Sequence, residues 1–306
     1  MKLWIRLVVD ALKGHKIKRT KLFWWSPRRP LSTLIPELRF NRGVWARLSL
    51  LSPRVLMNFG DEFSPLAWEY ATGRKADWSP ISRADVVAIG SVLDLAILSG
   101  SDAQFWGSGA RGDLMTENFR VIDRTRVLAV RGPLTAAKLG MKGLVLGDPG
   151  LLISEFVSNS DRRGTSSKLL FIPHFNTWKS HKGRAEISLA RSEGFEIVAP
   201  TLHPLQIAKK IARADFVASS SLHGVVFAHS LGTPVQLIAP TGGEANFKYD
   251  DYFLSMDADT SSVQIEHCLR DRIWIHHGEL LESASAGMRK RATALSDNLV
   301  AAVSRA

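Results

Sequence analysis

Short apolar runs alternate with amphipathic stretches along most of the chain, which is the pattern of strands that alternate with helices. The apolar runs contain no regular polar positions, so they predict strands buried on both faces of parallel sheets. Two series of such runs predict an α/β fold with two Rossmann-like lobes. The strands expected are residues 54–57, 85–90, 104–106, 126–130, 144–146, 169–172, 195–198, 216–218 and 235–238.

Helices are expected between these strands, and their ends carry local signals. Pro133 suits the first position of a helix, Gly140 suits a left-handed stop, and Ser91 suits an N-cap. The expected helices are residues 62–70, 91–98, 133–139, 181–193, 204–213 and 222–231, followed by a long amphipathic helix over 279–303.

A polar segment, residues 158–167, interrupts the alternation and is typical of an interdomain linker. A chain of 306 residues is also long enough for two domains. The expected organisation is a basic aromatic N-terminal segment (1–35), a first lobe (36–157), the linker (158–167), a second lobe (168–278) and a C-terminal helix (279–306).

The net charge of +11 is concentrated at the N-terminus, where residues 1–30 hold nine Lys or Arg and a single acid, Asp10. Trp4 and the run Phe23-Trp24-Trp25 are interleaved with these cations, a mixture that suits an anionic membrane surface. The alternative is a basic edge that packs on the body of the protein. Nucleic acid is not expected as a partner, because the basicity does not extend over a domain face.

The single cysteine, Cys268, excludes an intramolecular disulfide and fits a reducing compartment. No apolar run reaches the ~18–20 residues that span a bilayer, and the N-terminus lacks the apolar core of a signal peptide. We therefore expect a cytoplasmic protein that acts at the inner face of the cell membrane. No spacing of His, Asp and Glu suits a metal site, so no bound metal is expected.

The stretch Ser219–Gly224 follows one apolar run and precedes another, which places hydroxyls and free backbone N–H groups at a strand end and a helix start. Such a junction is an anion site. His223 in the first helical turn adds a side chain that can move protons near neutral pH. The alternative is that the serines are only N-caps and that His223 packs under a loop.

Polar residues also follow other predicted strands, in both halves of the chain. In α/β sheets ligands bind at the carboxyl ends of strands, so the cleft between the lobes is the expected active site. These residues are Asn58, Asp61, Ser91, Ser108, Arg131, Asp148 and His174.

Seven short motifs follow one another along the chain: Asn58-Phe59-Gly60-Asp61, Gly107-Ser108-Gly109, Val130–Thr135, Gly147-Asp148-Pro149, Ile172-Pro173-His174, Ser220–Gly224 and Phe247–Tyr252. In this order they resemble the bacterial polysaccharide pyruvyl transferases of the exopolysaccharide type, over about residues 54–256. The resemblance implies a GT-B-like architecture and transfer of a pyruvyl group from phosphoenolpyruvate to two sugar hydroxyls as a cyclic ketal, with no other cofactor. Fungal relatives carry Arg where this chain has Ser221.

Within that chemistry, His223 suits the general acid, protonated beside an anionic donor, and Asp61 suits a base or orienter of the sugar hydroxyl. Asn58 and Asp148 are expected to bind the acceptor. The donor is expected to contact Arg131, Ser220, Ser221, Leu222, Gly224 and His174.

Several of these residues have a structural alternative. Arg131 can pair with an acid, Asp61 can be only a helix N-cap, and Asp148 can be only a turn former. Lys248, Asp251 and Tyr252 can lie at the rim of the cleft or pin the last small helix to the second lobe, and His229 is expected to be packed or exposed rather than catalytic.

The acceptor implied by the resemblance is a saccharide repeat unit, lipid-linked at the membrane. Two other functions stay open. A GT-B glycosyltransferase would need a ribose-binding acid, for which the second lobe shows no specific signature. A non-catalytic protein would hold a phosphorylated ligand in the same anion site.

Overall fold

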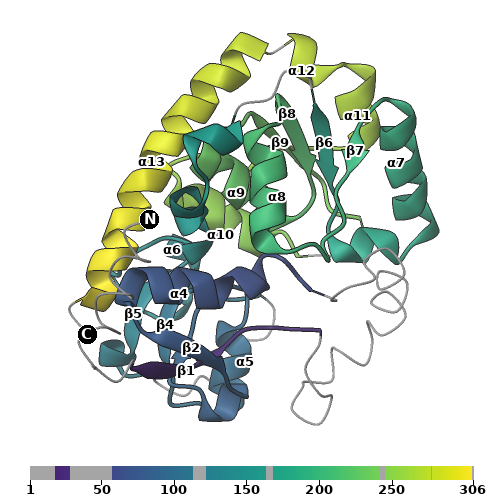
Figure 1. Ribbon diagram of the computed structural model, residues 1–306. Coiled ribbons are helices and arrows are strands. Elements are labelled where there is room, and N and C mark those ends of the chain that lie inside the picture. The colour runs from purple at the N-terminus through teal and green to yellow at the C-terminus, as the bar shows by residue number, and fades with distance from the viewer. Residues whose placement is uncertain are drawn as a thin grey trace.

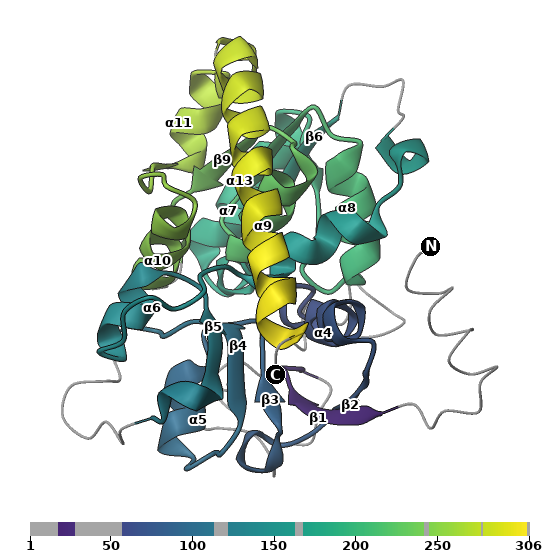
Figure 2. The ribbon, with the colours of Figure 1, turned by 90° about the vertical axis from the view of Figure 1, so that its left-hand side faces the viewer.

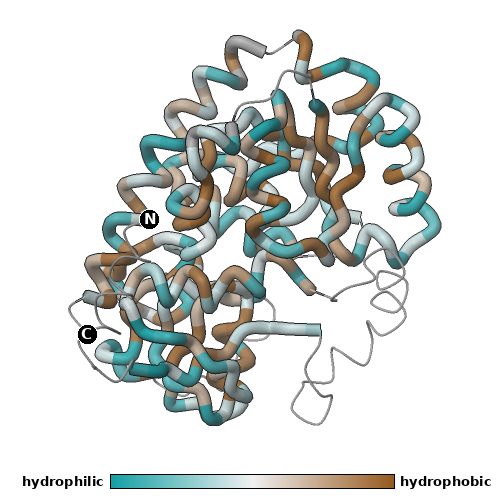
Figure 3. Tube along the Cα trace, in the orientation of Figure 1, coloured by the Kyte–Doolittle hydropathy of each residue, from teal (hydrophilic) through white to brown (hydrophobic). Residues whose placement is uncertain are grey.

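The structure is a computed structural model of the chain, and it describes residues 18–27, 57–112, 122–162, 168–241, 245–276 and 278–304. Two parallel sheets of five strands each form the centres of two lobes, one above the other in Figure 1. Helices with polar outer faces surround the apolar strands, as Figure 3 shows by hydropathy. The expected α/β fold with two Rossmann-like lobes is thereby confirmed.

Both sheets share one strand order. If the strands of each lobe are numbered from one along the chain, the order is 2-1-3-4-5 in both, which is a doubly wound arrangement. The first sheet runs β2 (Lys75–Trp78), β1 (Arg19–Phe23), β3 (Val86–Val87), β4 (Gln104–Ser108), β5 (Val127–Val130). The second runs β10 (Ser262–Val263), β9 (Val235–Ile238), β8 (Phe216–Ser219), β6 (Leu169–Ile172), β7 (Glu196–Ile197).

Most helices lie where the amphipathic stretches predict them. Pro133 is indeed the first residue of its helix, and Gly140 has the left-handed φ of 65°. Ser91 is not an N-cap, because α5 begins after Val92 and has no side-chain cap. The helices are α4 (Ser64–Thr72), α5 (Leu93–Leu98), α6 (Pro133–Lys138), α7 (His181–Ser192), α8 (Pro204–Ala212), α9 (Leu222–Leu231), α10 (Phe247–Ser255), α11 (Ile265–Arg270), α12 (Ile273–His276) and α13 (Gly278–Ser304).

The basic N-terminal segment is not separate from the first lobe where the structure describes it. Strand β1 lies between β2 and β3, so the lobe begins before residue 36. Leu22 and Phe23 are buried in the core, whereas the cationic positions Arg19 and Lys21 are exposed. Trp24 is also buried and donates from Nε1 to Glu62 Oε2 at 3.1 Å. These residues therefore match the alternative of a basic edge that packs on the body. Trp4 lies outside the described residues.

Some strand and linker predictions need correction. Strand β3 is only two residues long, and residues 144–146 contribute a single bridge between Leu146 and Val130. Residues 54–56 of the first predicted strand lie outside the described residues. In the expected linker, the short helix η6 (Asn159–Arg162) forms, and Asp161 pairs with Lys209 of α8 at 3.0 Å.

Helix α13 ties the two lobes together, and Figure 2 shows it running along both. It packs against α9 of the second lobe and against α4, β4 and β5 of the first. Leu299 is fully buried, and its carbonyl accepts from Trp106 Nε1 of β4 at 3.0 Å. The predicted long amphipathic helix is confirmed. Within the described ranges, no helix combines the length and apolar character needed to cross a membrane.

Candidate functional site

The candidate site lies where β6 and β8 end, side by side in the second sheet. These strands hold positions one and three of the 2-1-3-4-5 order, so their connecting segments diverge there and leave room for a ligand. His174 follows β6 and Ser220 follows β8. The His174 N–H donates to Ser220 Oγ at 2.9 Å, which joins the two segments.

The junction before α9 exposes backbone donors. Ser219 Oγ accepts from Ser221 N–H at 3.1 Å and lies 3.0 Å from the Ile172 carbonyl. A Cβ atom on Gly224 would approach Ser219 Oγ to 2.3 Å, so the close packing of the first turn of α9 against the end of β8 requires glycine. In the part of the chain that the structure describes, the first-turn N–H groups of residues 222–224 have no acceptor, and Ser221 makes no side-chain cap. Such N–H groups are what the predicted anion site requires, and binding of an anion there stays a prediction.

His223 projects from this first turn toward the first lobe. Its side chain is 13% exposed, and its ring packs edge-on against Phe59 at 6.5 Å between centroids. Burial, followed by the charges of Lys248, Arg131 and His174, lowers the pKa of His223 to about 3. Without a bound anion, His223 is therefore neutral at neutral pH, in contrast to the protonated form expected beside a donor.

Asp61 comes to the site from the first lobe, in the short helix η2 (Asp61–Phe63). Its Oδ2 accepts a hydrogen bond from Asn58 Nδ2, and it is not the N-cap of η2 or of α4. Burial raises the pKa of Asp61 to about 8, with further contributions from Asp148 and Glu62. A carboxyl group with such a pKa is suited to exchange a proton near neutral pH.

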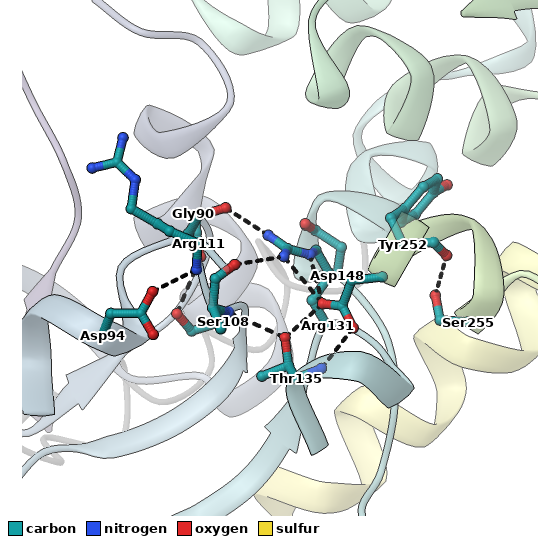
Figure 4. A network of polar contacts seen from close by, with 12 residues as sticks. Gly90, Asp94, Ser108, Arg111, Arg131, Thr135, Asp148, Tyr252 and Ser255 are labelled. Atoms are coloured by element: carbon teal, nitrogen blue, oxygen red, sulfur yellow. Dashed lines mark hydrogen bonds and ion pairs between the residues drawn. The ribbon is translucent and has the colours of Figure 1, made fainter. Parts of the chain in front are cut away.

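Arg131 and Asp251 form a buried ion pair between the end of β5 and α10. Arg131 Nε donates to Asp251 Oδ2 at 3.0 Å, and both side chains are almost fully buried. The same carboxylate accepts from the N–H and the hydroxyl of Thr135, near the start of α6, at 2.9 and 2.6 Å. Arg131 also donates to Ser91 Oγ and to the Ala110 carbonyl. Figure 4 shows Arg131 in this network, close to Thr135. This geometry matches the structural alternative for Arg131, and its contact with a donor stays a prediction.

Asp148 faces His223 across the lobes. Its Oδ1 accepts from Gly150 N–H at 2.8 Å, so it forms the turn that its sequence indicates. Its Oδ2 lies 3.7 Å from His223 Nε2. Burial raises the pKa of Asp148 to about 6. The expected contact of Asp148 with the acceptor stays a prediction.

Helix α10 brings a cation to the site that the sequence left open between two roles. Lys248 Nζ lies 3.4 Å from His174 Nε2 and 5.0 Å from the Tyr249 ring centroid. The Tyr249 hydroxyl donates to the Ser220 carbonyl at 2.7 Å and so holds α10 against the anion site. The motif Phe247–Tyr252 was the sequence signal for this helix.

His229, on the same helix as His223, takes no part in the site. It is packed, which is one of the two positions expected of it, with Nδ1 3.0 Å from the Tyr252 hydroxyl, and burial lowers its pKa to about 4. A surface hollow lies at the far end of α9 from His223, against α13. The described residues contain no group of three or more His, Cys, Asp or Glu placed to hold a metal ion.

Comparison with known proteins gives a family and two relatives. A sequence model described as polysaccharide pyruvyl transferase matches residues 10–241, more than half of the chain. The chain is 23% identical over 201 residues to the succinoglycan biosynthesis protein ExoV of Rhizobium meliloti (strain 1021), covering 64% of this chain and 60% of that protein. It is 30% identical over 131 residues to the uncharacterized protein L143 of Acanthamoeba polyphaga mimivirus, covering 40% and 45%. The alignments therefore span less than two thirds of either relative.

Proposed function

Because the chain belongs to the polysaccharide pyruvyl transferase family, we propose that it transfers a pyruvyl group from phosphoenolpyruvate to a sugar of an exopolysaccharide repeat unit. The similarity to a succinoglycan biosynthesis protein supports a role in exopolysaccharide modification. One observation carries the proposal: the imidazole of His223, at the start of α9, lies against Gly60, beside Asp61 of the other lobe. A GT-B-like arrangement with the active site between the lobes would put the donor and the acceptor on either side of this contact.

The donor site we propose is the start of α9 with the cations around it. Phosphoenolpyruvate carries a phosphate and a carboxylate, which need oriented N–H groups and positive charge. The first-turn amides and the Ser220 and Ser221 hydroxyls supply the polar contacts. Lys248, Arg131 and His174 all act electrostatically on His223, so their charges reach the same point. Bound anionic donor would offset these charges and favour the protonated imidazole.

The reaction then requires one proton delivered and two hydroxyl protons removed. His223 protonates the enol methylene carbon while a sugar hydroxyl attacks the adjacent carbon and gives its proton to the ionised form of Asp61, which a pKa of about 8 makes available as the pH approaches that value. The second hydroxyl then forms the second C–O bond as the phosphate leaves with the C–O electron pair. Its proton goes to the departing phosphate or to solvent. The products are a cyclic ketal and inorganic phosphate, with no change of oxidation state overall.

The acceptor side of the site belongs to the first lobe. Asn58 donates to Asp61 and so orients the carboxyl group toward the site. We infer that the acceptor is lipid-linked at the inner face of the membrane, where the cations of residues 1–30 would each add ~1 kcal/mol of attraction. Phe23 and Trp24 take no part in such a surface, because both are buried in the first lobe.

Thermal unfolding with phosphoenolpyruvate tests the donor assignment, with UDP, GDP and inorganic phosphate as controls. A ligand at 100 times its dissociation constant adds ~2.7 kcal/mol to the native state. We expect stabilisation that is selective for phosphoenolpyruvate. Selective stabilisation by a nucleoside diphosphate would instead indicate a glycosyltransferase.

Turnover is tested by acceptor-dependent release of phosphate and by mass spectrometry of the saccharide product. His223→Ala should abolish turnover but retain donor binding, whereas His181→Ala, an exposed position on α7, should change neither. Donor binding without turnover on any saccharide acceptor would support a non-catalytic binding protein.

A further inference from the structure

Two buried polar atoms of the site face each other without a hydrogen bond. His223 Nε2 and Asp148 Oδ2 are both fully shielded from solvent, and in the part of the chain that the structure describes neither has a hydrogen-bond partner. They lie 3.7 Å apart and come from different lobes. Buried polar groups in native proteins are almost always paired, so this pair needs an explanation.

The second oxygen of Asp148 already has a partner, whereas the second nitrogen of the ring faces Gly60. Asp148 Oδ1 accepts from Gly150 N–H, so only Oδ2 is left to interact with the imidazole. On the other side of the ring, Nδ1 is the atom nearest to the position that a Cβ atom on Gly60 would take. A shift of less than about 1 Å would turn the 3.7 Å contact into a hydrogen bond of ordinary length.

We propose that Asp148 is the positioning residue of His223: its Oδ2 accepts the Nε2 proton, fixes the ring and its tautomer, and leaves Nδ1 as the nitrogen that serves the donor. The role of Nδ1 in catalysis rests on the proposed pyruvyl transfer. The assignment of the proton to Nε2 does not depend on that reaction. Asp148 is thus assigned to the imidazole rather than to the acceptor sugar.

The charges around the imidazole show why such a partner matters. Lys248 from α10, Arg131 from the end of β5 and His174 after β6 all disfavour the imidazolium form. Asp61 on η2 and Asp251 on α10 are further acids in the site, and the latter is committed to Arg131. Asp148 is the carboxylate within ion-pair distance of the ring in the described structure. It therefore opposes the cations and makes protonation of Nδ1 attainable when the donor binds.

Nitrogen-15 NMR of histidine-labelled protein measures the tautomer directly, with the His223 signals assigned by their loss in His223→Gln. In the unmodified protein without ligand, we expect a neutral ring with its proton on Nε2. A proton on Nδ1, or an equal mixture of tautomers, would overturn the proposal. This measurement needs no variant of Asp148 and no substrate.

The Asp148→Asn variant sharpens the test. Gly150 N–H retains the amide oxygen as its acceptor, which leaves the NH2 group facing Nε2. Because an NH2 group donates, the proton of His223 should move to Nδ1. Asp94→Asn is the matched control, because Asp94 is also buried, accepts one backbone N–H (from Arg111) and has one unpaired oxygen. It should leave the His223 tautomer unchanged.

Kinetics then separate the positioning role from the proposed reaction. We expect Asp148→Asn to lower kcat by at least about tenfold with little change in KM for phosphoenolpyruvate, and Asp94→Asn to leave kcat unchanged. Equal kcat values for Asp148→Asn and the parent protein would overturn the proposal. If the tautomer is as expected but phosphoenolpyruvate is neither bound nor consumed, the proposed function fails and the positioning of His223 stands.

Discussion

Gly60 of the first lobe lies directly against His223 of the second, so closely that a Cβ atom on Gly60 would come within 1.9 Å of Nδ1. The φ angle of Gly60 is −63°, which any residue can adopt, so glycine is required here for space and not for backbone conformation. The backbone of the opposite lobe therefore limits the position of the imidazole on this side of the ring.

Gly60→Ala should displace the imidazole and lower turnover by at least about tenfold, since the proton donor would leave its position. Overpacking of this kind also costs about 1–3 kcal/mol of stability. The control is Gly287→Ala, at an open position of α13, which should stabilise the protein by about 0.5–1 kcal/mol. Turnover assays and denaturant unfolding of both variants check this. Full activity in Gly60→Ala would show that the ring is free to reposition.

Asp251→Ala should destabilise the protein by about 3–5 kcal/mol, because it leaves the Arg131 guanidinium buried without its counter-charge. It also removes the acceptor of Thr135 N–H at the start of α6. The double variant Arg131→Met with Asp251→Leu should recover part of the loss, since apolar pairs can replace buried ion pairs. Urea unfolding of the parent protein, of Asp251→Ala and of the double variant measures these differences in stability. Asp77→Ala, which breaks an exposed pair with Arg19, should cost far less. If Asp251→Ala and Asp77→Ala lost a comparable amount of stability, the structural role of the buried pair would be contradicted.

Asp61 should make the protein less stable as the pH rises. The pKa of its carboxyl group is about 8 in the folded protein and about 4 in an unfolded chain. Between these values the folded state binds a proton that the unfolded state has lost. The contribution of Asp61 therefore falls with increasing pH, by up to about 1.4 kcal/mol per pH unit.

The Asp61→Asn variant isolates this contribution. Its stability relative to the parent protein should improve steadily from about pH 4 to pH 8 and then level off. Urea unfolding at several pH values gives the difference directly. Asp123→Asn, at an exposed position where backbone hydrogen bonding lowers the pKa, should show no such gain in this range. A pH-independent difference for Asp61→Asn would mean that Asp61 ionises normally in the folded protein.

The features that the sequence predicts well are local. Strand β6 is a continuous apolar run, and β8 and β9 each contain a single polar residue, Ser219 and Gln236. Pro133 and Gly140 mark the ends of α6 by backbone geometry alone. The strand-to-helix junction before α9 was also predictable, because a strand end and a helix start are adjacent in sequence, and its binding of an anion stays a prediction.

The features that the sequence hides depend on distant partners. Strand β2 (Lys75–Trp78) has no fully buried residue and lies at a sheet edge, so it lacks an apolar run. The cations of β1 obscured its three buried positions, Thr20, Leu22 and Phe23. Asp251 meets Arg131 from 120 positions away. The low pKa of His223 likewise follows from burial and from charges on three separate segments, which no local pattern encodes.

Leu299→Ala should cost about 2–5 kcal/mol, because Leu299 is fully buried where α13 crosses the first lobe. Its side chain lies against Gly147, next to Asp148, so the cavity would open beside the site. Leu280→Ala on the same helix is the matched control, because Leu280 is 70% exposed and its truncation should change stability by less than about 0.5 kcal/mol. Thermal and urea unfolding compare the two. If α13 stabilises the lobes as the structure indicates, only Leu299→Ala will unfold at a lower temperature and a lower urea concentration than the parent protein. Equal stability of the two variants would show that the helix is not needed to hold the lobes together.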